Sequence, residues 1–79
     1  MLVIYYYNWN GTMKAMQEFE KEWKAKWDKI KGVKLMGMYT PTNAWNRAWL
    51  FDTDSADKLF ANAGIKHENE TNAEVVFLL

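Results

Sequence analysis

The chain contains no cysteine, one proline, one histidine and no long apolar run. The lack of cysteine excludes disulfides, zinc fingers, iron–sulfur clusters and thiol nucleophiles, and it is compatible with a cytoplasmic protein. A single histidine leaves no His-rich metal site, so we expect neither a metal nor a cofactor. No apolar run approaches the length of a membrane span, and the amino terminus lacks the features of a signal peptide. We therefore expect a cytoplasmic protein with no membrane partner.

An excess of charge of either sign is also absent, because ten basic residues balance ten acidic ones. Lysines are frequent in the first 34 residues, but acidic residues interrupt them between positions 18 and 28. This pattern favours a solvated helix face over a surface that binds nucleic acid. No P-loop, G-x-S-x-G or G-x-G-x-x-G motif occurs, which argues against phosphoryl transfer, triad-based acyl transfer and nicotinamide chemistry.

Aromatic residues, by contrast, make up 16% of the 79 residues and include five tryptophans. The length predicts a single domain over residues 1–79. A chain of this size buries only about 60–65% of its unfolded surface, so a lone core is marginal and a partner adds stability. Each large ring brings about 150–250 Å² to be buried. The aromatic residues therefore need a core, a pocket or an interface.

The first half of the chain predicts a strand followed by a long helix. Residues 2–9 are β-branched and aromatic, and Asn10-Gly11 ends the run. Over residues 12–31, apolar side chains recur at steps of three and four and share one side of a helix. These residues are Met13, Met16, Phe19, Trp23, Trp27 and Ile30. Gly32 stands where a left-handed residue can end the helix.

The second half predicts a hairpin, a short helix and a last strand. Strands over 33–40 and 44–51 flank a turn at Pro41. Alternation places four large side chains on one face of the second strand, namely Trp45, Arg47, Trp49 and Phe51. A helix starts at residues 52–55, with Asp54 as its cap, and ends at Gly64. Residues 67–72 read as a polar loop and 73–79 as a strand.

The resulting order, β-α-β-β-α-β, predicts an α+β fold of the ferredoxin-like kind. Two crossovers place both helices on one face of a four-stranded antiparallel sheet. The first and last strands carry apolar side chains on both faces, which would leave an apolar patch larger than monomers usually expose. We therefore expect a second copy of the chain to cover the other face.

These features resemble the dimeric α/β-barrel superfamily over essentially the whole chain. The likeness lies in the strand over 2–9, the long helix, the hairpin around Pro41 and the acidic cap over 52–55. It is closest in kind to the small uncharacterised members. The resemblance implies a homodimer of ferredoxin-like chains paired sheet to sheet, with a pocket between sheet and helices. The superfamily includes cofactor-independent monooxygenases, haem-degrading enzymes, lactone isomerases and proteins without known function.

Two residues are candidates for proton transfer, Glu20 and His67. Glu20 falls inside the apolar arc of the long helix, where burial among indoles and thioethers would raise the pKa of its carboxyl group. The alternative is a solvated position beside Lys24, one turn further on. His67 has the only side chain with an ordinary pKa near neutrality, but its polar neighbours also fit a solvated loop.

Candidate ligand-binding residues combine aromatic rings with one cation. Arg47 shares a predicted face with tryptophans and can hold an anion, or it can stack on a ring or pair with an acidic residue across a dimer interface. Phenols can donate to a bound carbonyl, and the helical stripe can line a cavity, although plain packing accounts for both patterns. The candidates are Tyr5, Tyr7, Trp23, Trp27, Tyr39, Arg47 and Trp49.

Three functions fit this sequence. The first is the binding of a small apolar or aromatic molecule between sheet and helices. The second is a cofactor-independent enzyme of the monooxygenase or isomerase type, acting on an aromatic or lactone substrate through Glu20, His67 or a tyrosine. The third is a purely structural assembly domain whose own side chains fill the pocket.

Overall fold

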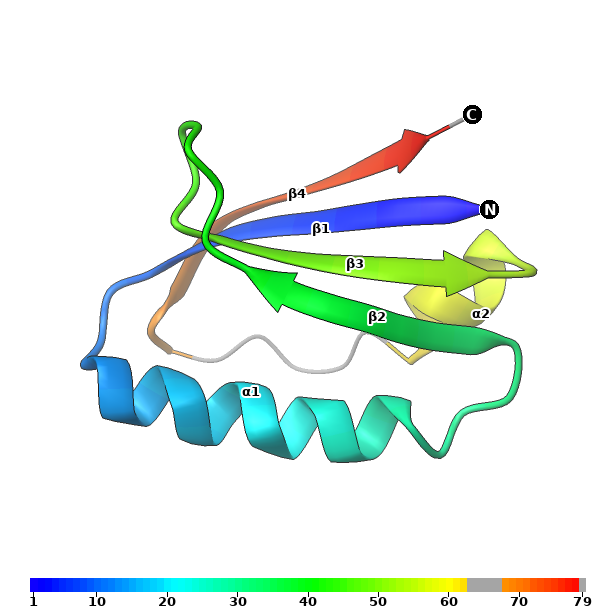
Figure 1. Cartoon of the computed structure of the whole chain (residues 1–79), viewed down its shortest axis with the longest axis horizontal. Coiled ribbons are helices and arrows are strands. Elements are labelled where there is room, and N and C mark those ends of the chain that lie inside the picture. The colour runs from blue at the N-terminus through cyan, green and yellow to red at the C-terminus, as the bar shows by residue number, and fades with distance from the viewer. Residues whose placement is uncertain (63–67, 79) are drawn as a thin grey trace.

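Four strands form one antiparallel sheet in the order β2-β3-β1-β4 (Figure 1). The computed structural model describes residues 1–62 and 68–78. The strands are β1 (Leu2–Trp9), β2 (Val33–Tyr39), β3 (Arg47–Thr53) and β4 (Glu70–Leu78), and the helices are α1 (Met13–Trp27) and α2 (Ala56–Ala61). The predicted α+β class, the four-stranded antiparallel sheet and the two helices are confirmed.

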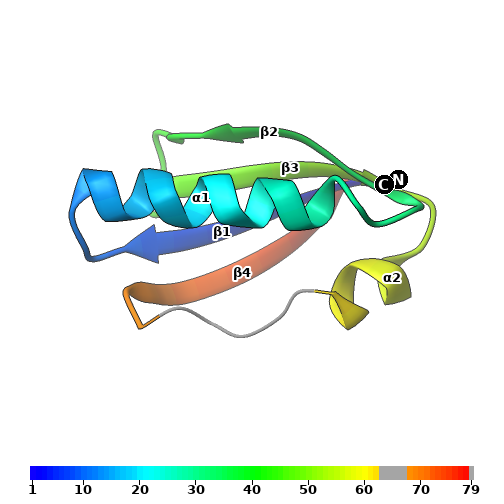
Figure 2. The same cartoon turned by 90° about the horizontal axis from the view of Figure 1, so that it is seen from below.

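Both helices pack against the same side of the sheet, which we call the inner face. Figure 2, seen from the helix side, shows α1 running in front of β1 and β3, with α2 on the β4 side of the sheet. Val3, Tyr7 and Phe51 of the inner face are almost fully buried, and Leu59 of α2 joins them in the core. Neither helix in the described part of the chain has the length and apolar character that a bilayer crossing requires.

Helix α1 begins where the sequence predicts and ends earlier. The hydroxyl of Thr12 accepts a hydrogen bond from the backbone N–H of Ala15 at 3.1 Å, which caps the first turn. The prediction that the helix reaches residue 31 is wrong, because it ends at Trp27. Beyond that point the N–H groups of residues 29 and 30 bond to carbonyls three residues back, which tightens the chain and turns it toward β2.

Gly32 has the predicted positive φ, 84°, but it lies in the turn before β2 and does not end the helix. A Cβ at this position would lie 2.7 Å from Nζ of Lys58 and 2.9 Å from the carboxylate of Asp54. The positive φ therefore favours glycine here, whereas the nearby atoms are ends of flexible side chains that can shift.

A bulge in β2 explains the irregular alternation in this part of the sequence. Leu35 pairs with Phe51 but Gly37 pairs with Leu50, so Met36 is an extra residue. The bulge brings both Leu35 and Met38 against the core.

Strand β3 starts at Arg47, three residues later than predicted, and a side chain takes the place of the missing strand residues. Oδ1 of Asn46 accepts from the backbone N–H of Trp9 at 2.8 Å, and its Nδ2 donates to the carbonyl of Trp9 at 3.1 Å. The expectation that Trp45 shares a face with Arg47 is wrong. Because the chain leaves the strand alternation before Arg47, Trp45 stacks on Tyr6, on the opposite face, at 5.2 Å between ring centroids.

The second helix and the last strand also differ from their predicted bounds. Ser55 is the N-cap residue of α2, and Asp54, the predicted cap, forms an ion pair with Lys58. The predicted helix end at Gly64 lies outside the described residues. Strand β4 begins at Glu70, inside the predicted loop, because Glu70 pairs with Trp9 of β1. Asn72, with φ 53°, lies where the register between β1 and β4 shifts.

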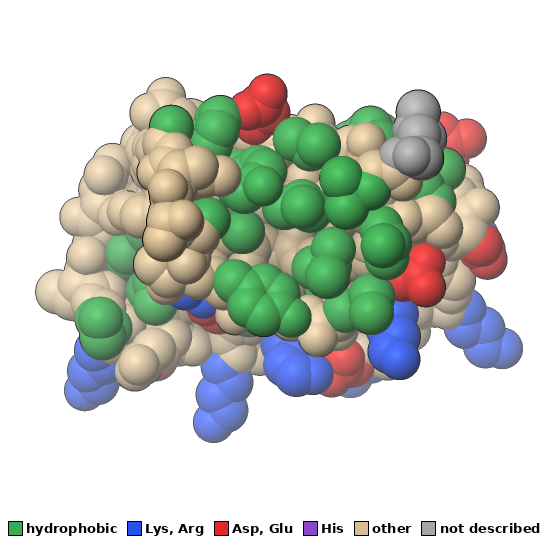
Figure 3. Space-filling view, turned by 45° about the horizontal axis from the view of Figure 1, so that its top comes forward, with side chains coloured by type: hydrophobic (Ala, Val, Ile, Leu, Met, Phe, Trp, Pro, Cys, Tyr) green, Lys and Arg blue, Asp and Glu red, His purple; other side chains and the backbone are tan. Residues whose placement is uncertain are grey.

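The outer face of the sheet, which the helices do not cover, is largely apolar. Figure 3 looks onto this face and shows hydrophobic side chains gathered over its centre, with charged side chains toward its margins. The strand registers place on it Leu2, Ile4, Tyr6, Ala48, Leu50, Val76 and Leu78, together with the acidic Asp52 and Glu74. Leu2 and Leu78 are among the exposed large hydrophobic residues, as is Met36 at the bulge.

Candidate functional site

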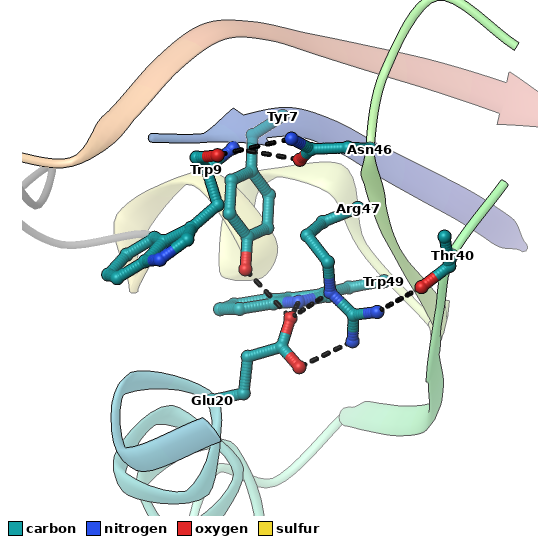
Figure 4. Close-up of polar contacts among 7 residues, drawn as sticks. All are labelled: Tyr7, Trp9, Glu20, Thr40, Asn46, Arg47 and Trp49. Atoms are coloured by element: carbon teal, nitrogen blue, oxygen red, sulfur yellow. Dashed lines mark hydrogen bonds and ion pairs between the residues drawn. The ribbon is translucent and has the colours of Figure 1, made fainter. Parts of the chain in front are cut away.

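Glu20 lies on the inward side of α1, and its carboxylate is the centre of a buried hydrogen-bond cluster (Figure 4). The hydroxyl of Tyr7 donates to Oε2 at 2.7 Å, and the indole Nε1 of Trp49 donates to the same oxygen at 2.9 Å. Arg47 donates through Nε to Oε2 at 2.7 Å and through Nη2 to Oε1. We call Tyr7, Glu20, Arg47 and Trp49 the Glu20 cluster.

The register of the sheet assembles the cluster from three elements. Tyr7 of β1 is paired with Arg47 of β3, and both project from the inner face. Trp49 is two residues further along β3 and therefore lies on the same face. Glu20 reaches them from the middle of α1 because it falls on the apolar side of that helix. The cluster thus joins α1 to the two central strands.

Charge is compensated within the cluster. The side chains of Glu20 and Arg47 are only 9% and 11% exposed. A carboxylate or guanidinium at such depth is costly unless it is paired and hydrogen-bonded. The bidentate contact between them meets this need, and Nη1 of Arg47 donates further to the hydroxyl of Thr40 at 2.8 Å. The expected alternative for Glu20, pairing with Lys24, is not what the structure shows, because Lys24 pairs with Asp28.

The environment keeps the two titratable donors of the cluster, Tyr7 and Arg47, protonated. Burial raises the pKa of the Tyr7 phenol well above its usual value, and the hydrogen bond and negative charge of Glu20 raise it further. Burial alone would lower the pKa of Arg47, but the hydrogen bond and charge of Glu20 outweigh it, so the pKa of Arg47 is raised. Tyr7 is therefore a neutral donor and Arg47 a cation across the physiological range.

Next to the cluster, a cavity of about 60 Å³ lies between the inner face and the two helices. Most of its lining residues are aromatic. The lining comprises Tyr5, Phe19, Trp23, Trp27, Trp49, Phe51, Leu59, Phe60, Glu70 and Val75. Phe60 is 52% exposed and so stands at the rim. Such a space can hold a small apolar body but offers it few polar contacts.

Trp49 belongs to both the cluster and the cavity. Its indole N–H is held by Glu20, and its ring forms part of the cavity wall. The ring also contacts Phe19 at 5.9 Å and Phe51 at 6.4 Å between centroids. The hydrogen bond from Glu20 therefore sets the orientation of one wall of the cavity.

Trp27 forms another part of the wall and differs from Trp49 in one respect. It is only 3% exposed, and its ring meets that of Phe51 edge to face at 4.9 Å between centroids. Its Nε1 is buried and, among the described residues, has no hydrogen-bond acceptor. Buried donors of this kind are uncommon in folded proteins.

The structure distributes the predicted ligand-binding residues among three places. Tyr5, Trp23, Trp27 and Trp49 line the cavity. Tyr7 and Arg47 belong to the Glu20 cluster, as does Glu20 itself, one of the two predicted proton-transfer residues. Tyr39 is separate from both, because it is 52% exposed and its ring lies over Gly37 on β2. The other proton-transfer candidate, His67, lies outside the described residues.

Glu20 and Arg47 are bonded to each other, which bears on the roles predicted for them, proton transfer for Glu20 and anion binding for Arg47. Both oxygens of the carboxylate accept hydrogen bonds within the cluster, and Glu20 is not among the described residues that line the cavity. The guanidinium of Arg47 is engaged by Glu20 and Thr40, so an anion would have to compete with a bidentate carboxylate. The described part of the chain offers no observation that favours the enzyme alternatives.

Sequence reasoning missed several cavity residues, including Phe19, Leu59, Phe60, Glu70 and Val75. Phe19 belongs to the apolar stripe of the long helix, which was the available signal. Glu70 gave none, because its polar neighbours suggested a loop. It is buried among the lining residues since β4 starts earlier than predicted.

No known protein family matches this chain at a significant level, and neither does any curated protein sequence or solved structure.

Proposed function

We propose that this chain binds a compact apolar or aromatic molecule in the cavity between its sheet and its helices, as a homodimeric domain of the dimeric α/β-barrel kind. The observation that carries the ligand proposal is the aromatic wall that surrounds an unfilled space. Protein interiors are otherwise close-packed, so an unfilled space of about 60 Å³ among aromatic side chains is unusual. A domain of only 79 residues has little stability to spare for such a space.

The size of the cavity limits the ligand. One water needs about 10–15 Å³, whereas an engineered cavity of about 150 Å³ encloses benzene. A space of 60 Å³ is therefore too small to enclose a whole ring in its present shape. Since Phe60 is half exposed at the rim, its side chain can move to admit a one-ring molecule and then cover the part that protrudes.

The ligand proposal is tested with two one-ring probes, acetophenone and α-methylstyrene, titrated into ¹⁵N-labelled protein. We expect at least one of them to shift the indole resonances of cavity tryptophans. Val75→Phe should abolish binding because the larger side chain fills the cavity. Gln17→Phe is the control, since Gln17 is on the exposed side of α1 and is not among the described residues that line the cavity. If neither probe shifts any cavity resonance at millimolar concentration, the proposal is wrong.

The homodimer is supported by the outer face and by the strand order. In β2-β3-β1-β4 each helical connection crosses over a neighbouring strand, as in a ferredoxin-like fold. That arrangement leaves the outer face without helices. In a single chain Leu2 and Leu78 are exposed there, and Ile4 and Leu50 are only partly buried. A second copy presents the same apolar surface, so a two-fold axis buries both at once, and the balanced charge adds no net repulsion.

Sedimentation equilibrium tests the dimer. We expect a particle of about twice 9.4 kDa for the natural chain and of 9.4 kDa for Ile4→Lys, which places a charge in the centre of the outer face. Gln17→Lys, on the exposed side of α1, should leave the dimer intact. Circular dichroism checks that each variant is folded. A natural chain that sediments as a monomer at high micromolar concentration would overturn the sheet-to-sheet barrel but leave the cavity proposal standing.

A further inference from the structure

The unsatisfied indole of Trp27 indicates what kind of molecule fits the cavity. A buried N–H without an acceptor is unfavourable, and the described residues provide none for Nε1 of Trp27. This atom has almost no exposed surface. Because Trp27 also lines the cavity, a ligand in that space is one source of the missing acceptor.

The ring of Phe51 packs against that of Trp27 edge to face at 4.9 Å, with an interplanar angle of 65°. An aromatic ring is at best a weak acceptor, so this contact does not replace a hydrogen bond to oxygen.

The indole N–H groups of Trp49 and Trp9 already have acceptors within the chain. Nε1 of Trp49 donates to Glu20, and Nε1 of Trp9 donates to the carbonyl of Thr12. Trp23 lines the cavity but is partly exposed, so water can satisfy its indole. Trp27 is thus the cavity tryptophan with a buried donor left over among the described residues.

We infer that the ligand of the cavity is a one-ring apolar molecule with a single oxygen acceptor, such as an aryl ketone, and that Trp27 donates to this oxygen. This inference rests on the cavity function proposed above and adds the chemical class of the ligand. The donor stays hidden until the ligand is in place, because the rings of Trp27 and Phe51 must shift slightly to admit the oxygen. Trp27 then acts as the specificity-determining residue, while the remaining rings supply apolar contact.

The test compares two probes that differ in one group. Acetophenone carries a carbonyl where α-methylstyrene carries an isosteric alkene, so shape is nearly constant and only the acceptor changes. We expect acetophenone to bind about three- to tenfold tighter, which is the value of one net hydrogen bond. In the natural chain, acetophenone should also move the indole proton resonance of Trp27 downfield, and α-methylstyrene should not.

Variants separate the donor from the ring. Trp27→Phe keeps an aromatic wall but removes the N–H, so the preference for acetophenone should disappear. Trp23→Phe is the matched control, the same change in a tryptophan that lines the same cavity, and it should keep the preference. The inference is wrong, and the cavity proposal stands, if both probes bind equally and neither moves the indole proton resonance of Trp27 downfield. If neither probe binds, the cavity proposal itself fails. The resonance of the natural chain decides the question even if Trp27→Phe does not fold.

Discussion

Two neighbouring regions between α1 and the sheet handle polar groups in opposite ways. In the Glu20 cluster, the carboxylate, the phenol, the guanidinium and the indole are joined by hydrogen bonds. In the cavity, aromatic rings surround a space, and the N–H of Trp27 has no acceptor in the described residues. A polar network whose hydrogen bonds are all formed holds the secondary-structure elements in one arrangement. An apolar site with an unfilled space leaves room for a ligand. The contrast supports a structural role for the first region and makes the second the site of the proposed ligand.

The largest expected effect comes from breaking the complete region. Glu20→Gln leaves the charge of Arg47 buried without a carboxylate, and the free energy of unfolding should fall by about 3–5 kcal/mol in urea denaturation. Glu18→Gln, at an exposed position on the same helix, should change it by less than about 0.5 kcal/mol.

If Glu20→Gln does not fold, the double variant Glu20→Met/Arg47→Met still tests the pair. It removes both charges together and should recover most of the lost stability, because apolar groups can replace a buried ion pair. An unchanged urea midpoint for Glu20→Gln would show that the cluster contributes nothing.

One identical substitution in the two regions gives an intermediate effect. Trp49→Phe removes an indole that donates to Glu20, whereas Trp27→Phe removes one that donates to no described residue. Both lose similar ring area, so their difference isolates the hydrogen bond to a charged group. We expect Trp49→Phe to cost about 1.5–3 kcal/mol more than Trp27→Phe in unfolding free energy measured without ligand. Equal losses would remove the distinction between the two tryptophans.

The smallest effect is the alkaline dependence of stability. The pKa of Tyr7 is raised above its ordinary value of 10.0 in the folded state. Above pH 10 the unfolded chain releases this proton and the folded chain keeps it, so stability present below pH 10 is lost as the pH rises. The loss should reach about 1 kcal/mol near pH 10.5.

Comparison with Tyr7→Phe isolates this group from the other titrating residues. Urea denaturation of both proteins at pH 8 to 10.5 should show a steeper decline for the natural chain. Tyr39→Phe, at an exposed position, serves as the control and should keep the natural slope. Parallel curves for the natural chain and Tyr7→Phe would mean that the phenol titrates alike in both states.

The predictions from sequence were accurate where the signal was local. The strand over residues 2–9 coincides with β1, because an aromatic and β-branched run ended by Asn10-Gly11 leaves little choice. The helical stripe correctly turned Phe19 and Trp27 inward. The ends of elements were less accurate, since tertiary pairing decides them. Glu70 entered β4 because Trp9 was available to pair with it, which no local pattern records.

The Glu20 cluster was only half visible in the sequence. Glu20 stood out as a carboxylate within an apolar stripe, and Arg47 as a cation on a face with Trp49, but nothing local joined them. They are 27 residues apart, and it is the register of β1 with β3 and the angle of α1 that bring them together. The cavity was suggested by its aromatic residues, but its size depends on how rings from four elements pack.

The side-chain amide of Asn46 bonds to the backbone of Trp9 and so extends the hydrogen-bond ladder between β1 and β3 by one pair. This anchor precedes Arg47 directly and fixes the point at which the chain enters the sheet. Residues added between Pro41 and Asn43 would therefore lengthen a surface loop without sliding one strand against the other. The segment should accept an inserted tag while the pairing of β1 with β3 keeps its register.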